Sequence, residues 1–379
     1  MKNKKIMMIA TTDNMIWQFM LPHIRHLQEL GNVVECVCAK TGFWFDELKD
    51  KYNLVVHEID FGRNPLKLKN FKGYKKLKQL QLERKYDLVY CQQPIGGMMG
   101  RLIGKKFKIP VIYTAHGFHF FKGCPLVNKL VYKPVEKWLS KYTNALITIN
   151  EEDYQSALKM KAKKVYKING IGIDGNKMKV EDFDKIAFRK ELGLKENDKV
   201  VLTVSELNQN KNYITMLQTI KILVSQDENI KFVSCGTGVW KEKIAEYAKE
   251  LGIENNVIFL GYRKDIAKIM HVSDIFFHAS YREGLTLSVM EAMSVGLPCV
   301  VSNVRGNRDL IKEGMGGHIC EPTDAEGFAL KINAVLKNKE TYKKFSEFNK
   351  QESENYFVNN VISQLESIYQ EVFSDKNDK

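Results

Sequence analysis

The sequence predicts an α/β protein made of two Rossmann-like domains, each with a parallel β-sheet covered by helices on both faces. Short apolar runs alternate with helical patterns along the chain, and these runs fall into two series. A polar stretch that contains several glycines separates the two series. The length of 379 residues also exceeds what one hydrophobic core usually supports, so two domains are expected.

The expected strands define the domain boundaries. The first series comprises residues 5–10, 33–39, 54–59, 88–92, 111–115 and 145–150. The second series comprises residues 200–204, 231–235, 257–260, 275–278 and 299–302. We therefore expect a first domain over residues 1–170, a linker over 171–198 and a second domain over 199–355. Residues 356–379 carry an apolar stripe at helical spacing and are expected to form a C-terminal helix that packs back on the first domain.

Composition indicates a protein that does not cross a membrane. No apolar run approaches the roughly 20 residues that a membrane-spanning helix needs. The apolar run after the N-terminal lysines ends too soon for a signal peptide. The seven cysteines are odd in number and lack paired metal-ligand spacing, which favours free thiols in a reducing compartment. We expect a cytoplasmic protein without disulfides or zinc.

Positive charge is concentrated in the N-terminal half. Residues 1–170 contain 30 lysines and arginines against 14 aspartates and glutamates, a net charge of +16, so the overall +13 leaves −3 for the remainder. Such a surface favours attachment to an anionic membrane, where each basic side chain contributes about 1 kcal/mol. Solvated helix faces are the alternative, with apolar residues at helical spacing turned to the core, namely Leu68, Phe71, Tyr74 and Leu77. The sequence has no recognition-helix, zinc-binding or aromatic pattern that would support binding of nucleic acid to this basic surface.

Residues 278–302 carry the strongest functional signal. Glu283 and Glu291 flank the expected start of a helix, and Gly284, Leu285 and Thr286 stand directly before its apolar positions. Free backbone N–H groups and the helix dipole at such a start attract phosphate, with a gain of about 0.3 to 1 kcal/mol. At 100° per residue the two glutamates lie about 80° apart around one helix, so they would hold opposite ends of a long ligand. An amphipathic helix with solvated acids is the alternative on spacing alone.

The same segment resembles the signature of retaining glycosyltransferase family 4. The stretch EGLTLSVMEAMSVGLP has two glutamates eight residues apart, followed by a small residue and Gly-x-Pro. The resemblance extends from the first strand to about residue 320. It implies the GT-B architecture, in which two Rossmann-like domains face each other across a ligand cleft. Under this resemblance the first domain binds the acceptor and the second binds a nucleotide sugar.

The resemblance assigns catalytic roles to Glu283, His116 and Lys211. Glu283 would hold hydroxyls of the transferred sugar, and His116 would lie beside that sugar. Lys211 follows the first strand of the second series and would neutralise the leaving diphosphate, as a metal ion would elsewhere. Taken without the resemblance, His116 and Lys211 read as an ordinary structural histidine and a surface lysine.

Donor binding is assigned to a further set of residues. Glu291 would accept hydrogen bonds from the ribose hydroxyls, and the backbone near residues 264–266 would contact the base, with uridine expected by analogy. The full set comprises Glu291, Gly284, Leu285, Thr286, Asp265, Ile266, Arg305 and Gly236. Family members usually also carry an arginine in the loop of Lys211, but Glu206 stands there. Arg305 or Arg282 could supply the missing cation.

No metal ion or cofactor is expected. The Asp182-Phe-Asp184 pair could suggest a divalent cation, but it lies at an acidic helix start within the expected linker. His116 and His119 lack a third ligand. The glycines of residues 96–100 fall short of a dinucleotide-binding fingerprint.

The sequence therefore predicts a metal-independent glycosyltransferase. It would move a hexose or N-acetylhexosamine from a UDP-sugar to a lipid-linked saccharide, with retention of configuration, in capsule or exopolysaccharide biosynthesis. We expect it at the inner face of the membrane as a peripheral protein, attached through the basic N-terminal domain. Two alternatives remain, a UDP-sugar 2-epimerase of the same fold and a non-catalytic subunit that binds sugar nucleotides.

Overall fold

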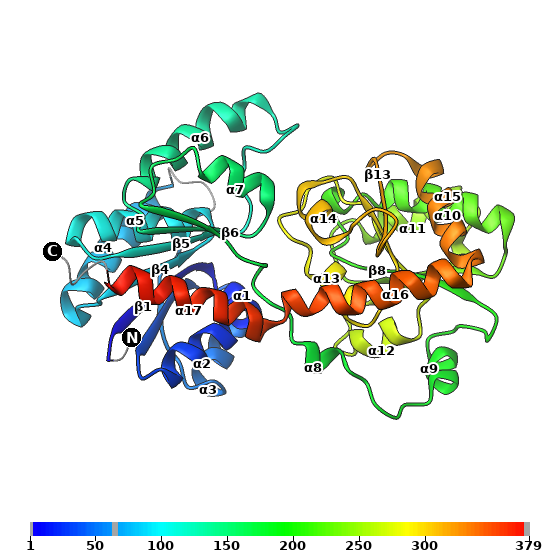
Figure 1. Ribbon diagram of the computed structural model, residues 1–379, viewed down its shortest axis with the longest axis horizontal. Coiled ribbons are helices and arrows are strands. Elements are labelled where there is room, and N and C mark those ends of the chain that lie inside the picture. The colour runs from blue at the N-terminus through cyan, green and yellow to red at the C-terminus, as the bar shows by residue number, and fades with distance from the viewer. Residues whose placement is uncertain (1–2, 63–66, 375–379) are drawn as a thin grey trace. The chain divides into compact units, whose positions relative to one another are not determined.

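The computed structural model describes residues 3–62 and 67–374, and it divides into two compact units (Figure 1). The first unit combines Met1–Gly172 with Val358–Lys379, and the second consists of Ile173–Phe357. Both units contain parallel sheets of Rossmann type flanked by helices, which confirms the expected α/β fold class. Within the described residues, no helix has the length and apolar character needed to cross a membrane.

The first unit contains a seven-stranded parallel sheet in the order β3-β2-β1-β4-β5-β6-β7. The central strands are buried along nearly their whole length, as expected for a parallel sheet covered on both faces. The strands are β1 (Lys5–Thr12), β2 (Val33–Ala39), β3 (Val55–Glu58), β4 (Leu88–Gln92), β5 (Val111–Ala115), β6 (Ala145–Thr148) and β7 (Lys164–Lys167).

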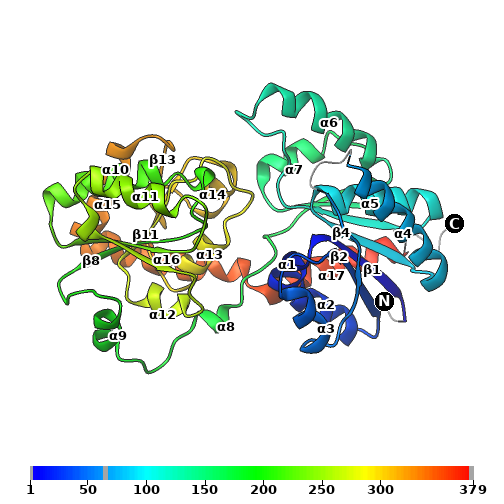
Figure 2. The same ribbon diagram turned by 180° about the vertical axis from the view of Figure 1, so that it is seen from behind.

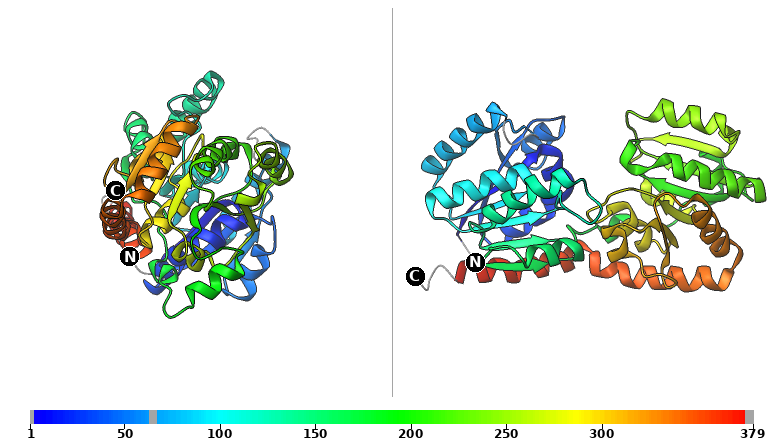
Figure 3. Two further views of the ribbon diagram at one scale, coloured as in Figure 1. Left: turned by 90° about the vertical axis from the view of Figure 1, so that its right-hand side faces the viewer. Right: turned by 90° about the horizontal axis from the view of Figure 1, so that it is seen from above.

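Helices cover the two faces of this sheet. The helices are α1 (Asp13–Met15), the π-helical turn η1 (Ile16–Met20), α2 (Leu21–Glu29), α3 (Trp44–Asp50), α4 (Leu68–Arg84), α5 (Pro94–Phe107), α6 (Leu126–Ser140), α7 (Glu151–Ala157) and α17 (Val358–Ser374). Side chains alternate along β4, so Val89 and Cys91 share a core with α4 and α5, whereas Tyr90 contacts Tyr369 of α17. Figure 3 shows α17 running beside the strands of this unit.

The C-terminal helix α17 belongs to the first unit. Its apolar stripe is buried, including Val361, Leu365, Ile368 and Val372. Glu366 also lies 3.7 Å from His26 of α2, which places α2 and α17 on the same side of the sheet. The expected helix reached residue 379, and residues 375–379 lie outside the described part of the chain.

The second unit contains a six-stranded parallel sheet in the order β10-β9-β8-β11-β12-β13. Its strands are β8 (Lys199–Val204), β9 (Ile230–Cys235), β10 (Val257–Gly261), β11 (Ile275–His278), β12 (Cys299–Ser302) and β13 (Gly317–Cys320). Its helices are α8 (Gly175–Met178), α9 (Lys185–Glu191), η2 (Gln209–Lys211), α10 (Tyr213–Gln226), α11 (Lys241–Glu250), η3 (Glu254–Asn256), α12 (Ile266–His271), α13 (Leu287–Ser294), α14 (Arg305–Leu310), α15 (Ala325–Lys337), α16 (Lys339–Ser353) and η4 (Glu354–Tyr356). Figure 2 shows α10, α11 and α15 grouped together in this unit.

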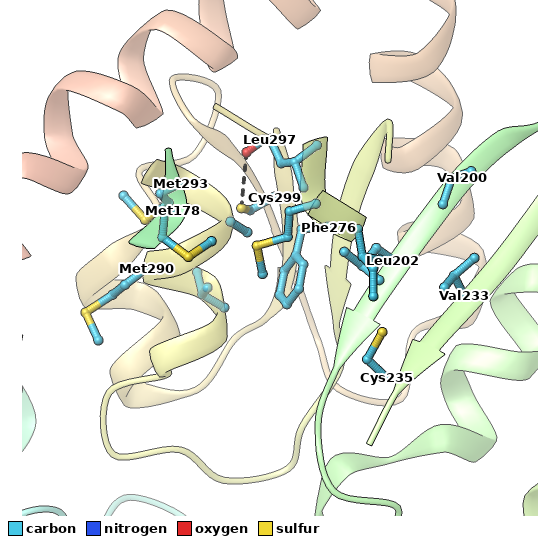
Figure 4. Packing of buried hydrophobic residues seen from close by; sticks show 14 of the residues in the cluster. Met178, Val200, Leu202, Val233, Cys235, Phe276, Met290, Met293, Leu297 and Cys299 are labelled. Carbon is cyan, nitrogen blue, oxygen red and sulfur yellow. Dashed lines mark hydrogen bonds between the residues drawn. The ribbon is translucent and has the colours of Figure 1, made fainter. Parts of the chain in front are cut away.

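Most of the expected linker is part of the second unit, which corrects the expected boundary. Residues from Ile173 onward belong to this unit, and Met178 of α8 lies in the same buried cluster as Met290 and Met293 of α13 (Figure 4). Phe188 of α9 is buried in that cluster too. The segment looked polar in sequence, but most of its apolar side chains, including Ile173, Phe188 and Leu192, are buried in the core.

The acidic start of α9 follows the sequence expectation. Asp184 caps the helix by accepting hydrogen bonds from the N–H groups of Ile186 and Ala187 at 3.0 Å each. A carboxylate in this position satisfies backbone donors that the helix leaves unpaired. This capping role accounts for Asp184, the second aspartate of the Asp182-Phe-Asp184 pair.

Two expectations about the elements were wrong. Strands β7 and β13 were not expected; both are four-residue edge strands, and β7 begins and ends with lysine. Leu68 and Phe71 of α4 were expected in the core, but their exposed fractions are 80% and 60%. Only Leu77, two turns later, is fully buried.

Candidate functional site

The strand order of the second unit creates a switch point at the centre of its sheet. The chain runs outward from β8 through β9 to β10 and then returns to β11, which pairs with β8 on the other side. Loops that leave neighbouring strands at such a point diverge, and ligands commonly bind there, outside the carboxyl ends of the strands. The loop after β8 carries Lys211, and the loop after β11 carries Glu283.

Asparagine side chains fasten these two loops together. The side chain of Asn210 donates from Nδ2 to the carbonyl oxygen of Arg282 at 2.9 Å. The backbone carbonyl of Asn210 accepts from the N–H of Tyr281, also at 2.9 Å. Asn212 is buried with φ +57° and donates to the carbonyl of Ala279 at 3.0 Å. Asparagine tolerates this left-handed conformation better than most residues. The loop of Lys211 is thus held against the loop of Glu283.

The site contains one carboxylate that contacts two nitrogen donors. Oε1 of Glu283 accepts a hydrogen bond from Nζ of Lys211 at 2.7 Å and lies 2.9 Å from Nε2 of His278. His278 is the last residue of β11, is fully buried, and also lies within hydrogen-bond distance of Oγ of Ser280, at 2.8 Å. Among the described residues, none donates a hydrogen bond to Oε2 of Glu283. That oxygen is available to a ligand hydroxyl.

The surroundings keep this carboxylate ionised. Burial by itself would raise the pKa of Glu283, but the charge of Lys211 and the hydrogen bond from His278 hold that pKa well below its usual range. Burial lowers the pKa of His278 and outweighs the opposing effect of Glu283, so the imidazole is neutral near pH 7. The arrangement is therefore a Lys–Glu ion pair steadied by a neutral histidine.

The helix that follows Glu283 presents an uncapped N-terminus. Thr286 precedes α13, but its hydroxyl donates to Oδ1 of Asn307 at 2.7 Å and does not cap the helix. Gly306 packs so closely that an added Cβ would lie 2.4 Å from the carbonyl oxygen of Gly284. The first-turn amides of α13 lack a side-chain partner in the described structure, and such amides bind anions well. Leu285 lies between these contacts and is partly buried against the core.

Glu291 lies in the second turn of α13 and has an unusual environment. It is partly buried, and within the described part of the chain its carboxylate makes no hydrogen bond or ion pair. Burial raises its pKa from 4.5 to about 7, against a weak opposing effect from Lys177. Unpartnered carboxylates with shifted pKa values are typical of functional sites. Because Glu283 precedes the helix, the expected 80° angle around one helix was wrong.

The other donor-binding candidates lie at the ends of strands β9 and β10. Gly236 has φ +143°, and an added Cβ would lie 2.0 Å from the carbonyl oxygen of Ser205, so only glycine fits. The carboxylate of Asp265 is paired with Arg263 through distances of 2.8 and 2.6 Å. This pairing lowers the pKa of Asp265, and the backbone carbonyl of Asp265 accepts from the N–H of Ile269 at 3.3 Å. In the described structure the N–H of Ile266, at the start of α12, has no hydrogen-bond partner and is open to a ligand.

The structure also describes the residues considered in place of the missing arginine. Glu206 is exposed at the end of β8. Arg305 is buried at the start of α14 and donates from Nε to the carbonyl oxygen of Glu283 at 2.9 Å, which fixes the backbone of the acidic loop. Arg282 is exposed beside Glu283. Arg305 therefore supports the loop, whereas Arg282 is the more accessible cation.

His116 belongs to the first unit and is not part of the Lys211–Glu283 group. Its Nε2 lies 2.8 Å from Oε1 of Gln92, and burial lowers its pKa to about 4. It lines a cavity of about 480 Å³ at the carboxyl ends of β1, β4 and β5, together with Thr12 and Gln93. This is the switch point of the first sheet, so the first unit has a binding cavity of its own.

Sequence reasoning missed His278, Ser280, Asn210 and Asn212. The position of His278 at the end of a strand, five residues before Glu283, was a usable signal, because side chains at that edge point to ligands in parallel sheets. The two asparagines gave no signal, since their role depends on a loop 70 residues away. Within the described residues, no group of three histidine, cysteine or acidic side chains could hold a metal ion. All seven cysteines are buried and unpaired.

Two family models match this chain and together cover most of it. Residues 184–352 match the model of glycosyl transferases group 1, and residues 5–150 match the model described as glycosyl transferase 4-like. The chain is also 31% identical to EpsD of Bacillus subtilis over 372 residues, 97% of this chain and 96% of EpsD. The chain belongs to glycosyltransferase family 4.

Further comparisons agree with this family and with the GT-B fold. A UDP-Gal:alpha-D-GlcNAc-diphosphoundecaprenol alpha-1,3-galactosyltransferase of Escherichia coli is 31% identical over 310 residues, 80% of this chain and 79% of that enzyme. The crystal structure of Anabaena HepE in complex with UDP and glucose matches with a TM-score of 0.84 and 18% identity, over 97% of this chain and all of HepE. The HepE likeness concerns the fold alone. This glycosyltransferase therefore has the predicted GT-B fold.

Proposed function

We propose that this glycosyltransferase moves a hexose or N-acetylhexosamine from a UDP-sugar to a lipid-linked saccharide, with retention of configuration. The observation that carries the proposal is the ionised Glu283, held through one oxygen by Lys211 and His278 at the switch point of the second sheet. The relative from Escherichia coli has a UDP-galactose donor and a diphosphoundecaprenol-linked acceptor in its name, which supports this class of substrates. Capsule or exopolysaccharide assembly is the proposed pathway.

The donor would occupy the second unit. An ammonium group has three N–H donors, and Lys211 uses one of them on Glu283, so the others can bind the diphosphate. The uncapped amides of α13 add further donors for phosphate oxygens. Glu291 would accept hydrogen bonds from the ribose hydroxyls, and the backbone at Asp265 and Ile266 would contact the base. Gly236 would let the chain turn tightly beside the nucleotide.

The transfer step exchanges one bond at the anomeric carbon for another. The bond between that carbon and the diphosphate oxygen breaks, and a new bond to the acceptor oxygen forms on the same face of the sugar. Oε2 of Glu283 would hold a sugar hydroxyl, so that the ring is oriented while charge develops. Lys211 and the α13 amides would stabilise the growing negative charge on the diphosphate, which can take the acceptor proton. No step in this proposal needs a metal ion.

The experiment that tests the proposal is a donor panel with product analysis. The purified protein is incubated with UDP-sugars and GDP-sugars, with and without a lipid-diphosphate saccharide, and released nucleotide and modified lipid are measured. We expect UDP release that depends on the acceptor, a retained anomeric configuration, and a rate that a chelator changes less than twofold. Epimerised UDP-sugar formed without acceptor, or no turnover of any donor, would contradict the proposal.

A further inference from the structure

The outer face of α6, in the first unit, exposes a contiguous set of large apolar side chains. Six of them are between 43% and 69% exposed, namely Leu126, Val127, Leu130, Val131, Val135 and Trp138. At 100° per residue these six positions fall within one half of the helix circumference. Figure 1 shows α6 along the outer edge of its unit. An exposed apolar surface of this kind marks an interaction site on a folded protein.

The opposite face of α6 is fixed firmly to the unit. Glu136 and Arg101 of α5 form a buried ion pair through two contacts of 2.7 and 3.2 Å, and Arg101 also lies 4.0 Å from the ring centroid of Tyr113. Leu139 and Ser140 are fully buried beside it. Because a buried, bidentate pair fixes orientation, the apolar half of α6 must face outward.

A row of lysines borders the apolar half. Lys129, Lys133 and Lys137 recur every four residues, so they lie along one edge of the helix. All three are exposed, and within the described part of the chain none of them forms an ion pair. On the neighbouring helix, Lys105 lies 5.4 Å from the ring centroid of Trp138. Apolar, aromatic and cationic groups are thus presented together, as in helices that lie at a lipid interface.

The inner side of α6 also forms a wall of the cavity that contains His116. Tyr132, Val135, Glu136 and Leu139 line this cavity of about 480 Å³. Val135 is shared between the cavity wall and the exposed apolar set. A surface that binds α6 from outside would therefore contact Val135, a residue that also lines the cavity.

We propose that the outer face of α6 docks onto an anionic phospholipid surface, with the helix lying in the plane of the interface. The lysine row favours anionic lipid over a second copy of this chain, because two copies would bring like charges together. The role of this docking rests on the proposed function, in which the acceptor is lipid-linked. Docking would then bring the head group of the acceptor to the cavity. Binding to lipid itself can be measured without donor or acceptor, so the two proposals can fail separately.

The test is co-sedimentation of the full chain with vesicles of phosphatidylglycerol and phosphatidylcholine, or of phosphatidylcholine alone. We expect binding to the anionic vesicles only, and weaker binding as salt is raised. Replacing the lysines in the variant K129Q/K133Q/K137Q should weaken binding about 100-fold, because each contributes a factor of about five near an anionic surface. The variant L126S/L130S should weaken it about tenfold through lost apolar contact.

Matched controls change the same residue types on the second unit. The variant V239S/L330S removes two exposed apolar side chains, and K241Q/K249Q/K344Q removes three exposed lysines. Both should bind vesicles within twofold of the parent protein, and thermal unfolding should show that all variants are folded. The proposal is overturned if the α6 variants bind like their controls, or if the parent protein binds no vesicle. It is also overturned if sedimentation shows a dimer that only the α6 variants lose.

Discussion

Nε2 of His278 lies 2.9 Å from Oε1 of Glu283, the same oxygen that accepts a hydrogen bond from Lys211. His278 is rigid because it ends a buried strand, whereas Glu283 lies on a loop. The histidine therefore fixes where the loop carboxylate points. This relationship gives His278 a positioning role that differs from direct contact with substrate.

Replacing His278 by asparagine should lower kcat about tenfold, because the shorter side chain cannot reach Glu283. The dissociation constant for UDP should stay within twofold, as measured by calorimetry. The double variant H278N/E283Q should be no slower than E283Q alone, since both changes disable one unit. Additive losses in the double variant would show that His278 acts independently of Glu283. His271, a partly buried histidine of α12, provides the control substitution H271N.

Replacing Glu283 by glutamine should lower the transfer rate about 100-fold or more and leave UDP binding intact. The amide keeps the size of the side chain but loses the charge that orders sugar hydroxyls and pairs with Lys211. Initial rates at saturating donor and acceptor provide the measurement. The exposed Glu246 of α11 lies outside the loops of the site and offers a matched control, E246Q, for which we expect less than a twofold change. Full activity in E283Q would remove Glu283 from the mechanism.

Affinity for UDP should rise with pH through the titration of Glu291. The pKa of its carboxyl is raised to about 7 in the free protein, and ribose hydroxyls bind best to the ionised form. The dissociation constant should therefore be roughly tenfold weaker at pH 6 than at pH 8. Calorimetry with the variant E291Q corrects for the titration of UDP itself. The dissociation constant of E291Q for UDP should depend less on pH than that of the parent protein. Equal pH profiles for the two proteins would exclude Glu291 from the ribose site.

The same carboxyl should reduce stability as pH rises. Its pKa is near 4.5 in the unfolded chain and about 7 in the folded one, so between these values the folded state binds more protons. The free energy of unfolding should consequently fall by about 2 to 3 kcal/mol from pH 4.5 to pH 8 through this group. Denaturant titrations should show E291Q to be more stable than the parent protein at pH 8 and nearly equal to it at pH 5. A variant less stable at pH 8 would contradict this account.

Substitution of Gly236 should be severe, whereas a matched glycine should tolerate the same change. In G236A the new Cβ would meet the carbonyl oxygen of Ser205 at 2.0 Å in a backbone with φ +143°, which should cost at least about 3 kcal/mol. Gly252 has φ +67° and no neighbour within 4 Å of an added Cβ, so G252A should cost only about 1 kcal/mol. Urea unfolding measures both values. Equal losses would show that contact with Ser205 is unimportant.

Much of the fold could be predicted from the sequence, because parallel strands buried on both faces appear as continuous apolar runs. This signal located β4, β5, β11 and β12 at their observed bounds. It failed for the edge strands β7 and β13, although it located the edge strands β3 and β10. It also failed for the segment after Gly172, where only a few apolar side chains contribute to the core. The sequence also did not show that apolar residues of α4 and α6 are exposed, since helical spacing alone does not tell which face of a helix meets the core.

The sequence by itself determined the family and the chemistry available at residues 278–302, because the signature is local and each residue type has a fixed chemical capacity. Tertiary structure alone decided which groups meet. Lys211 and Glu283 are 72 residues apart in the chain, and they pair only because β8 and β11 are neighbours in the sheet. His278 joins them because its strand ends at the same edge. Local patterns cannot encode such contacts, since they depend on the order in which distant strands assemble.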